Sequence, residues 1–197
     1  GWVTAKGSWD ISNNEIHPTS IDNNILIQNF NYNCVSADFA GIDMNLGPKF
    51  GIVLCYQNAN NYYVIYHNTG GTAQLRIAKV VNGVETVLKT KNLGNPAKNS
   101  WFNIKGRKIN NVLYLDYNGV FQISIADNTF TTGSVGVFVK SPRNVVAHRV
   151  DNFSGCQTCS ANNEQSLSVK ELNLKVYPNP TTGKITAEFT SKTTELY

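Results

Sequence analysis

Two Asn-Gly dipeptides, each set between short segments of apolar and polar residues, constrain the fold of this chain more than any other feature. Asn82-Gly83 lies between VV and VETVL, and Asn118-Gly119 lies between LYLDY and VFQIS. Both residues of such a dipeptide tolerate positive φ, which closes a two-residue hairpin with the twist of its flanking strands. The sequence therefore predicts two tight β-hairpins.

Segments typical of β-strands fill most of the chain around these turns. They are short, rich in β-branched and aromatic residues, and separated by turn residues. The predicted strands are 50–57, 60–68, 72–80, 85–90, 100–108, 111–117, 120–127, 134–140 and 146–153. Their connections are too short for parallel crossovers, which need a dozen or more residues, so neighbouring strands must be mostly antiparallel. We therefore expect an all-β fold, an antiparallel two-sheet sandwich of the jelly-roll type.

The composition and the residue pattern of the sequence change after Gly155. The segment CQTCSANNEQSLSVKE is polar and does not alternate, as is typical of linkers. A new strand and turn then begin with LKVYPNPTTGKITAEF. We therefore predict a β-domain over residues 1–155, a linker over 156–173, and a fragment of a second β-domain over 174–197.

Charge and hydropathy exclude several classes of partner. Residues 1–155 hold 13 Lys and Arg against 9 Asp and Glu, whereas residues 156–197 hold four of each. The excess is too small and too scattered for nucleic-acid binding, but it leaves two interpretations, a mild preference for an anionic partner or ordinary surface lysines. We expect no membrane span, because no apolar run reaches about 18 residues. The opening GWVTAKG has neither Met nor a charged-then-apolar leader, so we expect any signal peptide to have been removed.

Four cysteines allow more than one arrangement. The CxxC of Cys156 and Cys159 lacks the βαβ context of a redox site and a second ligand pair for zinc, so a small structural disulfide between them is favoured over a metal site. Cys34 and Cys55 lie in apolar segments, and we expect both to be buried.

The first 155 residues resemble a known superfamily. The runs FGIVLCYQNANNYYVIYHNTGG, LRIAKVVNGVETVL, WFNIKGRKINNVLYLDYNGV and DNTFTTGSVGVFVKSPRNVVAHRVDNF are similar to the concanavalin A-like/laminin G-like jelly rolls. The resemblance implies an accessory domain of a secreted polysaccharide-degrading enzyme. The same fold serves lectins, adhesion modules, lyases and hydrolases, so the fold alone does not assign a function.

The last segment resembles a second family. VYPNPTTGKITAEF is similar to the start of the type A C-terminal sorting domain of the bacterial type IX secretion system, which begins with the turn found here at Tyr177-Pro178-Asn179-Pro180, followed by Gly183. Members of that family continue well beyond this length, so we expect residues 174–197 to be a truncated sorting domain. The resemblance implies a secreted, extracellular or cell-surface protein; the alternative is an ordinary Pro-rich turn.

A catalytic constellation is not evident in residues 1–155. Glycoside hydrolysis needs two carboxylates across a cleft, which on one strand favours acidic residues at i and i+2 or i+4. Only Glu15, Glu85 and seven Asp are available, and no pair has that arrangement. The closely spaced Glu-Asp-Glu of jelly-roll hydrolases and the His and Arg strands of alginate lyases are also missing. We therefore expect no enzymatic activity.

A sugar-binding face requires less, namely a few aromatic rings flanked by polar and charged groups. Strand alternation sends one set of residues inward, Tyr63, Ile65, Leu75, Ile77, Phe102, Ile104, Leu113, Leu115 and Tyr117. If the outward faces belong to one concave sheet, the ligand-binding groove is formed by Tyr62, Tyr66, Arg76, Lys105, Tyr114 and Asp116. The alternative is that the tyrosines are half-buried cross-strand partners and the basic residues a solvated surface. For Trp2, Trp9 and Trp101 we expect core or edge packing.

One cofactor and a set of partners complete the prediction. Related jelly rolls hold a structural Ca²⁺ near their terminal strands, and the resemblance implies Asp151 as a ligand, with Asp10 near it. We expect a monomeric, noncatalytic carbohydrate-binding module, joined to an upstream catalytic domain and binding an acidic polysaccharide such as alginate or a sulfated algal galactan. The alternatives are a laminin-G-like adhesion or protein-interaction module, and a lyase or hydrolase with an unfamiliar site.

Overall fold

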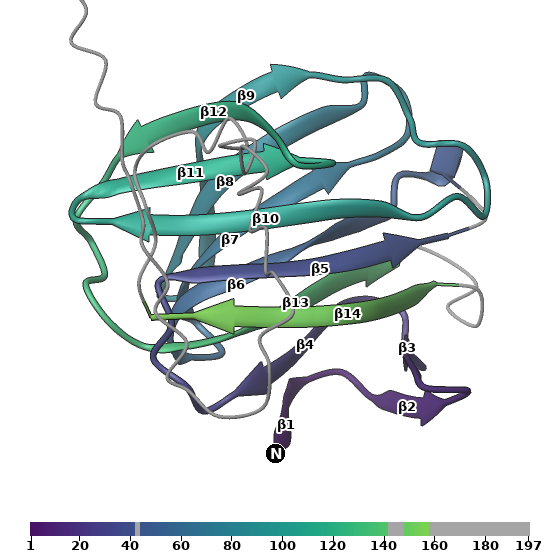
Figure 1. The fold of residues 1–197 in the computed structure, drawn as a ribbon, viewed down its shortest axis with the longest axis horizontal. Helices are drawn as coiled ribbons and strands as arrows, with labels where there is room; N and C mark the ends of the chain where they lie inside the picture. The colour runs from purple at the N-terminus through teal and green to yellow at the C-terminus, as the bar shows by residue number, and fades with distance from the viewer. Residues whose placement is uncertain (42–43, 142–147, 158–197) are drawn as a thin grey trace, which may run out of the picture. The chain divides into compact units, whose positions relative to one another are not determined.

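Two antiparallel seven-stranded sheets make up the described part of the protein (Figure 1). The structure is a computed structural model that describes residues 1–41, 44–141 and 148–157. Sheet A has the order β1 (Trp2–Lys6), β4 (Asp22–Gln28), β13 (Ser134–Ser141), β6 (Lys49–Asn58), β7 (Asn61–Asn68), β8 (Gln74–Val81), β9 (Val84–Asn92). Sheet B has the order β12 (Val120–Ala126), β11 (Val112–Tyr117), β10 (Phe102–Ile109), β5 (Cys34–Ala40), β14 (Arg149–Cys156), β3 (Glu15–Pro18), β2 (Trp9–Ser12). The short 3₁₀ helix η1 spans Met44–Leu46.

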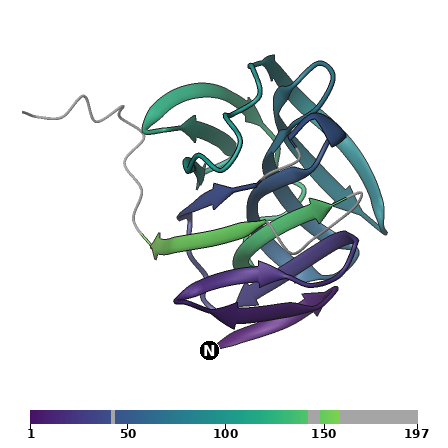
Figure 2. The same ribbon diagram turned by 90° about the vertical axis from the view of Figure 1, so that its right-hand side faces the viewer.

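The predicted all-β, antiparallel, two-sheet fold is confirmed. The nine predicted strands correspond to β6 through β14, and both Asn-Gly hairpins close with positive φ, 51° at Asn82 and 49° at Asn118. Five further strands, β1 to β5, precede them and were not predicted individually. The two views agree that β1 to β4 lie at one side of the sandwich, away from β9 and β12, whereas β5 lies in the middle of sheet B (Figures 1 and 2).

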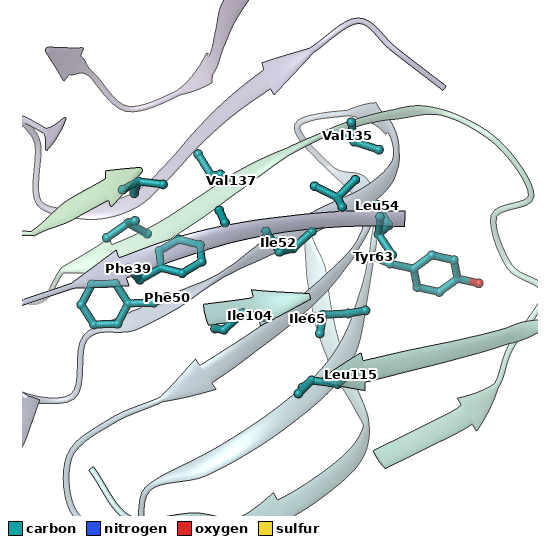
Figure 3. Close-up of a cluster of buried hydrophobic side chains, with 14 of the residues drawn as sticks. Phe39, Phe50, Ile52, Leu54, Tyr63, Ile65, Ile104, Leu115, Val135 and Val137 are labelled. Atoms are coloured by element: carbon teal, nitrogen blue, oxygen red, sulfur yellow. The ribbon is translucent and has the colours of Figure 1, made fainter. Parts of the chain in front are cut away.

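The main core lies between the two sheets. All nine residues that strand alternation sends inward belong to it or pack against it, which confirms the predicted faces of β7, β8, β10 and β11. Figure 3 shows Phe39 and Phe50 at one end of this core and Tyr63 at the other, with Ile52, Ile65, Ile104 and Leu115 among the side chains between them. Burial of each large apolar side chain contributes about 1.5–3 kcal/mol, so this layer is the principal source of stability.

A second apolar cluster covers the outer face of sheet A. Its members come from neighbouring strands of that sheet: Ile25, Ile27, Val53, Tyr62, Val64, Tyr66, Ala78, Val80 and Phe138. Antiparallel sheets commonly present a polar outer face to water, so a buried apolar layer here distinguishes sheet A from an ordinary solvated sheet. It provides a rigid base for the polar side chains above it.

Several predictions fall at the end of the described residues or beyond it. The linker at 156–173, apart from its first two residues, and the sorting-like segment at 174–197 lie outside the described ranges, as does Cys159 of the CxxC. Cys34 and Cys55 are buried, as expected. Within the described ranges, no helix has the length and apolar character that a membrane crossing requires.

Candidate functional site

The six predicted ligand-binding residues are divided between the two outer faces of the sandwich. Tyr62, Tyr66 and Arg76 lie on β7 and β8 of sheet A, where Tyr66 is directly opposite Arg76. The other three lie on β10 and β11 of sheet B, where Lys105 is opposite Asp116 and Arg107 is opposite Tyr114. Because the core separates these faces, the six residues cannot line one groove.

On sheet A, a lysine and a glutamate meet above Tyr66. The Lys49 ammonium lies 4.8 Å from the centre of the Tyr66 ring and 3.4 Å from Oε2 of Glu85. The Tyr66 hydroxyl donates a hydrogen bond to Oε1 of Glu85 at 2.5 Å. Lys49 comes from β6 and Glu85 from β9, so this network crosses four neighbouring strands. We call the set Lys49, Tyr62, Tyr66, Arg76, Glu85 and Lys140 the sheet A site.

A glycine lies beneath the Tyr66 side chain. Gly51 of β6 is directly opposite Tyr66, and a Cβ at this glycine would lie 2.5 Å from Cβ of Tyr66 and 2.4 Å from the Ile65 carbonyl oxygen. Real Cβ atoms do not approach other atoms so closely. The absence of a side chain at Gly51 therefore allows Tyr66 to pack down on the sheet, which positions its hydroxyl for Glu85.

The tyrosines of the sheet A site are buried. Tyr66 is 0% exposed and Tyr62 is 4% exposed. Burial, with Glu85 nearby, raises the pKa of Tyr62 to about 12. Burial also raises the pKa of Tyr66, and its hydrogen bond to Glu85 adds to the effect because the neutral phenol is the donor. Both rings therefore match the alternative interpretation, in which these tyrosines are packed cross-strand partners.

Cations outnumber carboxylates above these rings. Lys140 of β13 lies directly opposite Lys49, and Arg76 lies on β8 beyond Tyr66. Burial lowers the pKa of Lys49, and Glu85 opposes that shift while Lys140 and Arg76 reinforce it. Like charges directly opposite each other destabilise a sheet, so the pairing of two lysines here is not explained by stability.

On sheet B, several charged residues are paired with partners from within the protein. Nη2 of Arg107 donates to Oδ1 of Asp116 at 2.8 Å, and the Arg107 guanidinium lies 5.0 Å from the centre of the Tyr114 ring. Nearby, Asp38 accepts hydrogen bonds from the side-chain amides of Asn103 and Asn152, at 2.7 and 2.8 Å. Asp116 and Asp38 therefore both have donors from within the protein.

The predicted calcium ligands do not converge within the described residues. Asp151 is opposite Asp38 on β5, whereas Asp10 is opposite His17 at the edge of the sheet. Oδ1 of Asp151 accepts a hydrogen bond from the Asn152 backbone. The described residues include no group of three His, Cys, Asp or Glu side chains that could hold a metal. Within the described residues no such group includes Asp10 or Asp151, and calcium binding stays a prediction.

Three members of the sheet A site, Lys49, Glu85 and Lys140, were not predicted from the sequence. Lys49 and Lys140 alternate with core residues of β6 and β13, so the same alternation rule, applied to those strands, identifies them as outward. Glu85 pairs with Val80 close to the Asn82-Gly83 turn, so the hairpin register places it on the same outer face as Arg76. Only the structure reveals that it reaches Tyr66.

Comparisons with known proteins agree on the fold. No family model matches the sequence, and no curated protein sequence matches it.

Among solved structures, the carbohydrate binding module CBM66 from Bacillus subtilis matches with a TM-score of 0.65 and 16% identity, over 78% of this chain and 93% of that one. A Bacillus licheniformis β-glucanase matches with a TM-score of 0.56 and 16% identity, over 77% of this chain and 89% of that one. A prokaryotic β-1,3-1,4-glucanase (lichenase) derived from a mouse hindgut metagenome matches with a TM-score of 0.60 and 10% identity, over 80% and 93%. The chain therefore has the concanavalin A-like jelly-roll sandwich fold.

Proposed function

We propose that the protein is a noncatalytic carbohydrate-binding module that binds an acidic polysaccharide through the sheet A site. Its structural neighbours, which include a carbohydrate binding module and glucanases, support a function related to glycans. The observation that carries the finer proposal is the excess of cations in this site, where Lys49, Lys140 and Arg76 lie on nearby strands and Glu85 is the single carboxylate. Uronate and sulfate groups carry the charge that would balance it.

The geometry of the site suits contact by its charged groups. Because the tyrosine rings are buried, the ligand meets the cations above them. The side chains of Lys49 and Glu85 are 17% and 35% exposed, so both reach the surface. Arg76 is already oriented, since its Nη2 and Nε donate to Oε1 of Gln74 at 2.8 and 3.1 Å. A guanidinium held in this way loses less conformational entropy on binding a carboxylate or sulfate.

Two features of the site favour binding over bond cleavage. Hydrolysis by the usual glycosidase mechanisms needs a pair of carboxylates, and Glu85 is the only carboxylate among the six residues of the sheet A site. The raised pKa of Tyr66 leaves its phenol protonated at neutral pH, so this tyrosine is not a base for a lyase reaction. The site can therefore hold a polyanion, and it lacks the second carboxylate that hydrolysis requires.

The apolar layer of sheet A bears on the adhesion alternative. A protein-interaction surface is commonly an exposed apolar patch. Here the apolar residues are buried, and Lys49 and Glu85 reach the surface above Tyr66, so the accessible part of the site is polar. A hydrated, anionic polymer matches this surface better than an apolar protein partner does.

The wider setting follows from the sequence resemblances. The module would be secreted or held at the cell surface by the sorting-like segment at 174–197, and would keep an upstream catalytic domain close to its polysaccharide. As a monomer with one charged face, it would act as a targeting unit. Detecting the protein in culture medium or on the cell surface, and losing that location when residues 174–197 are removed, would test this part of the proposal.

Affinity electrophoresis tests the binding proposal directly. The parent protein and two variants, Arg76→Gln and Lys140→Gln, are run in gels that contain alginate, carrageenan or the neutral glucan laminarin. We expect the acidic polymers to retard the parent protein and each variant to bind roughly tenfold more weakly, a loss of about 1.4 kcal/mol. Assays for new reducing ends and unsaturated products, with the same polymers, should give none.

Lys105→Gln provides the matched control, since it removes the same charge from the outer face of sheet B. This variant should bind acidic polymers as the parent protein does. Equal weakening by Lys105→Gln and Lys140→Gln would mean that net charge alone drives retention, and the sheet A site would then be rejected. Product release from any polymer would reject the noncatalytic assignment.

A further inference from the structure

Trp101 is more exposed than the other two tryptophans. Trp2 and Trp9 pack against the main core, whereas Trp101 is 41% exposed. It directly precedes β10, whose first residue, Phe102, points into the core. Strand alternation therefore places the indole on the outer face of sheet B, close to the beginning of β14.

Three residues from other strands hold this exposed ring in place. The guanidinium carbon of Arg149, in β14, lies 4.8 Å from the centre of the Trp101 ring. Nη1 of Arg149 is 3.4 Å from Oε1 of Glu15 in β3, and Oε2 of Glu15 is 3.6 Å from Nε2 of His17. This series of contacts fixes the guanidinium, and the guanidinium in turn orients the indole.

We propose that Trp101, Arg149 and Glu15 form a second carbohydrate site, one that binds a neutral sugar. The indole offers an apolar surface on which the C–H face of a pyranose can stack. Arg149 supplies donors and Glu15 supplies acceptors, and together they can hydrogen-bond adjacent hydroxyls of the same sugar. A ring that is already oriented loses little conformational entropy on binding.

Charge separates this site from the sheet A site. Arg149 and Glu15 neutralise each other, so the Trp101 site has no excess charge to attract a uronate or a sulfate. The sheet A site has three cations for one carboxylate. The second site deepens the proposed carbohydrate-binding function and rests on it, but it predicts a different class of ligand and can be tested separately.

Tryptophan fluorescence and affinity electrophoresis, performed on the full chain, test the proposal together. The neutral probes are laminarin, barley β-glucan and galactomannan, and alginate is the acidic probe. We expect at least one neutral polymer to retard the protein and to shift its tryptophan emission. Trp101→Ala should weaken that retardation at least tenfold while leaving the retardation by alginate unchanged.

Two more variants control for folding and for general loss of aromatic surface. Phe121→Ala removes another exposed aromatic residue of sheet B, 39% exposed, and should retain neutral-polymer binding. Arg149→Gln keeps the indole but removes the guanidinium, and should weaken binding even if Trp101→Ala is too unstable to test. Near-ultraviolet circular dichroism establishes that each variant is folded.

The outcomes distinguish the two sites. Retardation by alginate but by none of the neutral polymers overturns the Trp101 site and leaves the sheet A site standing. Neutral-polymer binding that survives both Trp101→Ala and Arg149→Gln also overturns it. Neutral binding that depends on Trp101, with no response to alginate, supports the second site and contradicts the acidic specificity proposed for the first. Retardation by none of these polymers overturns both.

Discussion

The outer faces of sheets A and B contain similar residue types, yet they arrange their charges differently. On sheet B, Arg107 and Asp116 form a close pair of low exposure. On sheet A, Lys49 has Glu85 on one side and the like charge of Lys140 directly opposite. Charges that are matched within a protein are explained by its own stability. An unmatched excess, supported on a rigid apolar layer, is better explained by a ligand that supplies the missing charge.

The largest expected effect concerns the ion pair of sheet B. The side chains of Arg107 and Asp116 are only 6% and 9% exposed. Asp116→Ala leaves the guanidinium without this carboxylate in a poorly hydrated position, and we expect unfolding to become about 3–5 kcal/mol easier. Urea denaturation measures the change.

Glu85→Ala is the matched change on sheet A, where the partners are more exposed. We expect it to cost about 1 kcal/mol or less, as is usual for such ion pairs, although it also removes an acceptor from the Tyr66 hydroxyl. If Asp116→Ala and Glu85→Ala lower the free energy of unfolding equally, the two faces do not differ in the pairing of their charges.

The next prediction concerns the pH dependence of stability, which depends on a histidine buried between the two sheets. His67 of β7 is 0% exposed, and its ring packs edge-on against Phe102 and Tyr117 of sheet B, with ring centres 5.9 and 5.4 Å away. Burial lowers the pKa of His67 to about 4, below its ordinary value of 6.5. The unfolded chain therefore binds a proton at a higher pH than the folded protein does, and stability falls as the pH decreases from about 6.5 to about 4.

Replacing this histidine removes its share of the acid sensitivity. Between pH 7 and pH 4 we expect the parent protein to lose roughly 3 kcal/mol more stability than His67→Leu does. Thermal unfolding of both proteins over this pH range provides the measurement. Parallel pH profiles would show that the imidazole does not stay neutral between the sheets.

Gly51→Ala tests the base of the sheet A site. A Cβ at this position collides with backbone and with Cβ of Tyr66, so we expect a loss of about 1–3 kcal/mol and weaker binding of acidic polymers. Gly94→Ala is the control, because a Cβ there meets nothing within 4 Å. If Gly51→Ala is as stable as Gly94→Ala, the close packing of Tyr66 on this strand is incorrect.

The smallest expected changes in stability, those of Lys140→Gln and Lys105→Gln, have opposite signs. Lys140→Gln relieves the repulsion with Lys49, so we expect it to raise stability by about 0.5 kcal/mol while it weakens binding. Lys105→Gln removes a charge opposite Asp116 and should lower stability by a similar amount without affecting binding. A reversal of these signs in urea denaturation would contradict the difference in charge matching between the faces.

Local sequence patterns predicted much of this fold. Alternation correctly separated Tyr63 and Ile65 from Tyr62 and Tyr66, because the side-chain period of a strand is fixed by its geometry. The Asn-Gly turns were recognised because a two-residue hairpin requires positive φ, which these two residue types tolerate. The turn at Asn13-Asn14, with φ of 53° and 62°, was missed because its sequence is less diagnostic and its flanking strands have only four residues each.

The candidate site was harder to predict because it depends on long-range pairing. Alternation shows that Arg76 and Lys105 both point outward, but not that their strands belong to different sheets. That assignment follows from pairings such as β13 with β6 and β10 with β5, which join segments far apart in the chain. The hairpin register places Glu85 on the outer face, but its contact with Tyr66 joins two strands that are not neighbours in the sheet, and strand alternation does not predict such a contact.

Chemical-shift mapping by NMR tests the central claim most directly. An isotope-labelled sample is titrated with alginate oligosaccharides, and the backbone signals that move are assigned. The sheet A site predicts shifts concentrated at Lys49, Tyr66, Arg76 and Lys140, on four adjacent strands of one sheet. Shifts concentrated around Lys105 on sheet B, or no shifts with any acidic oligosaccharide, would contradict it.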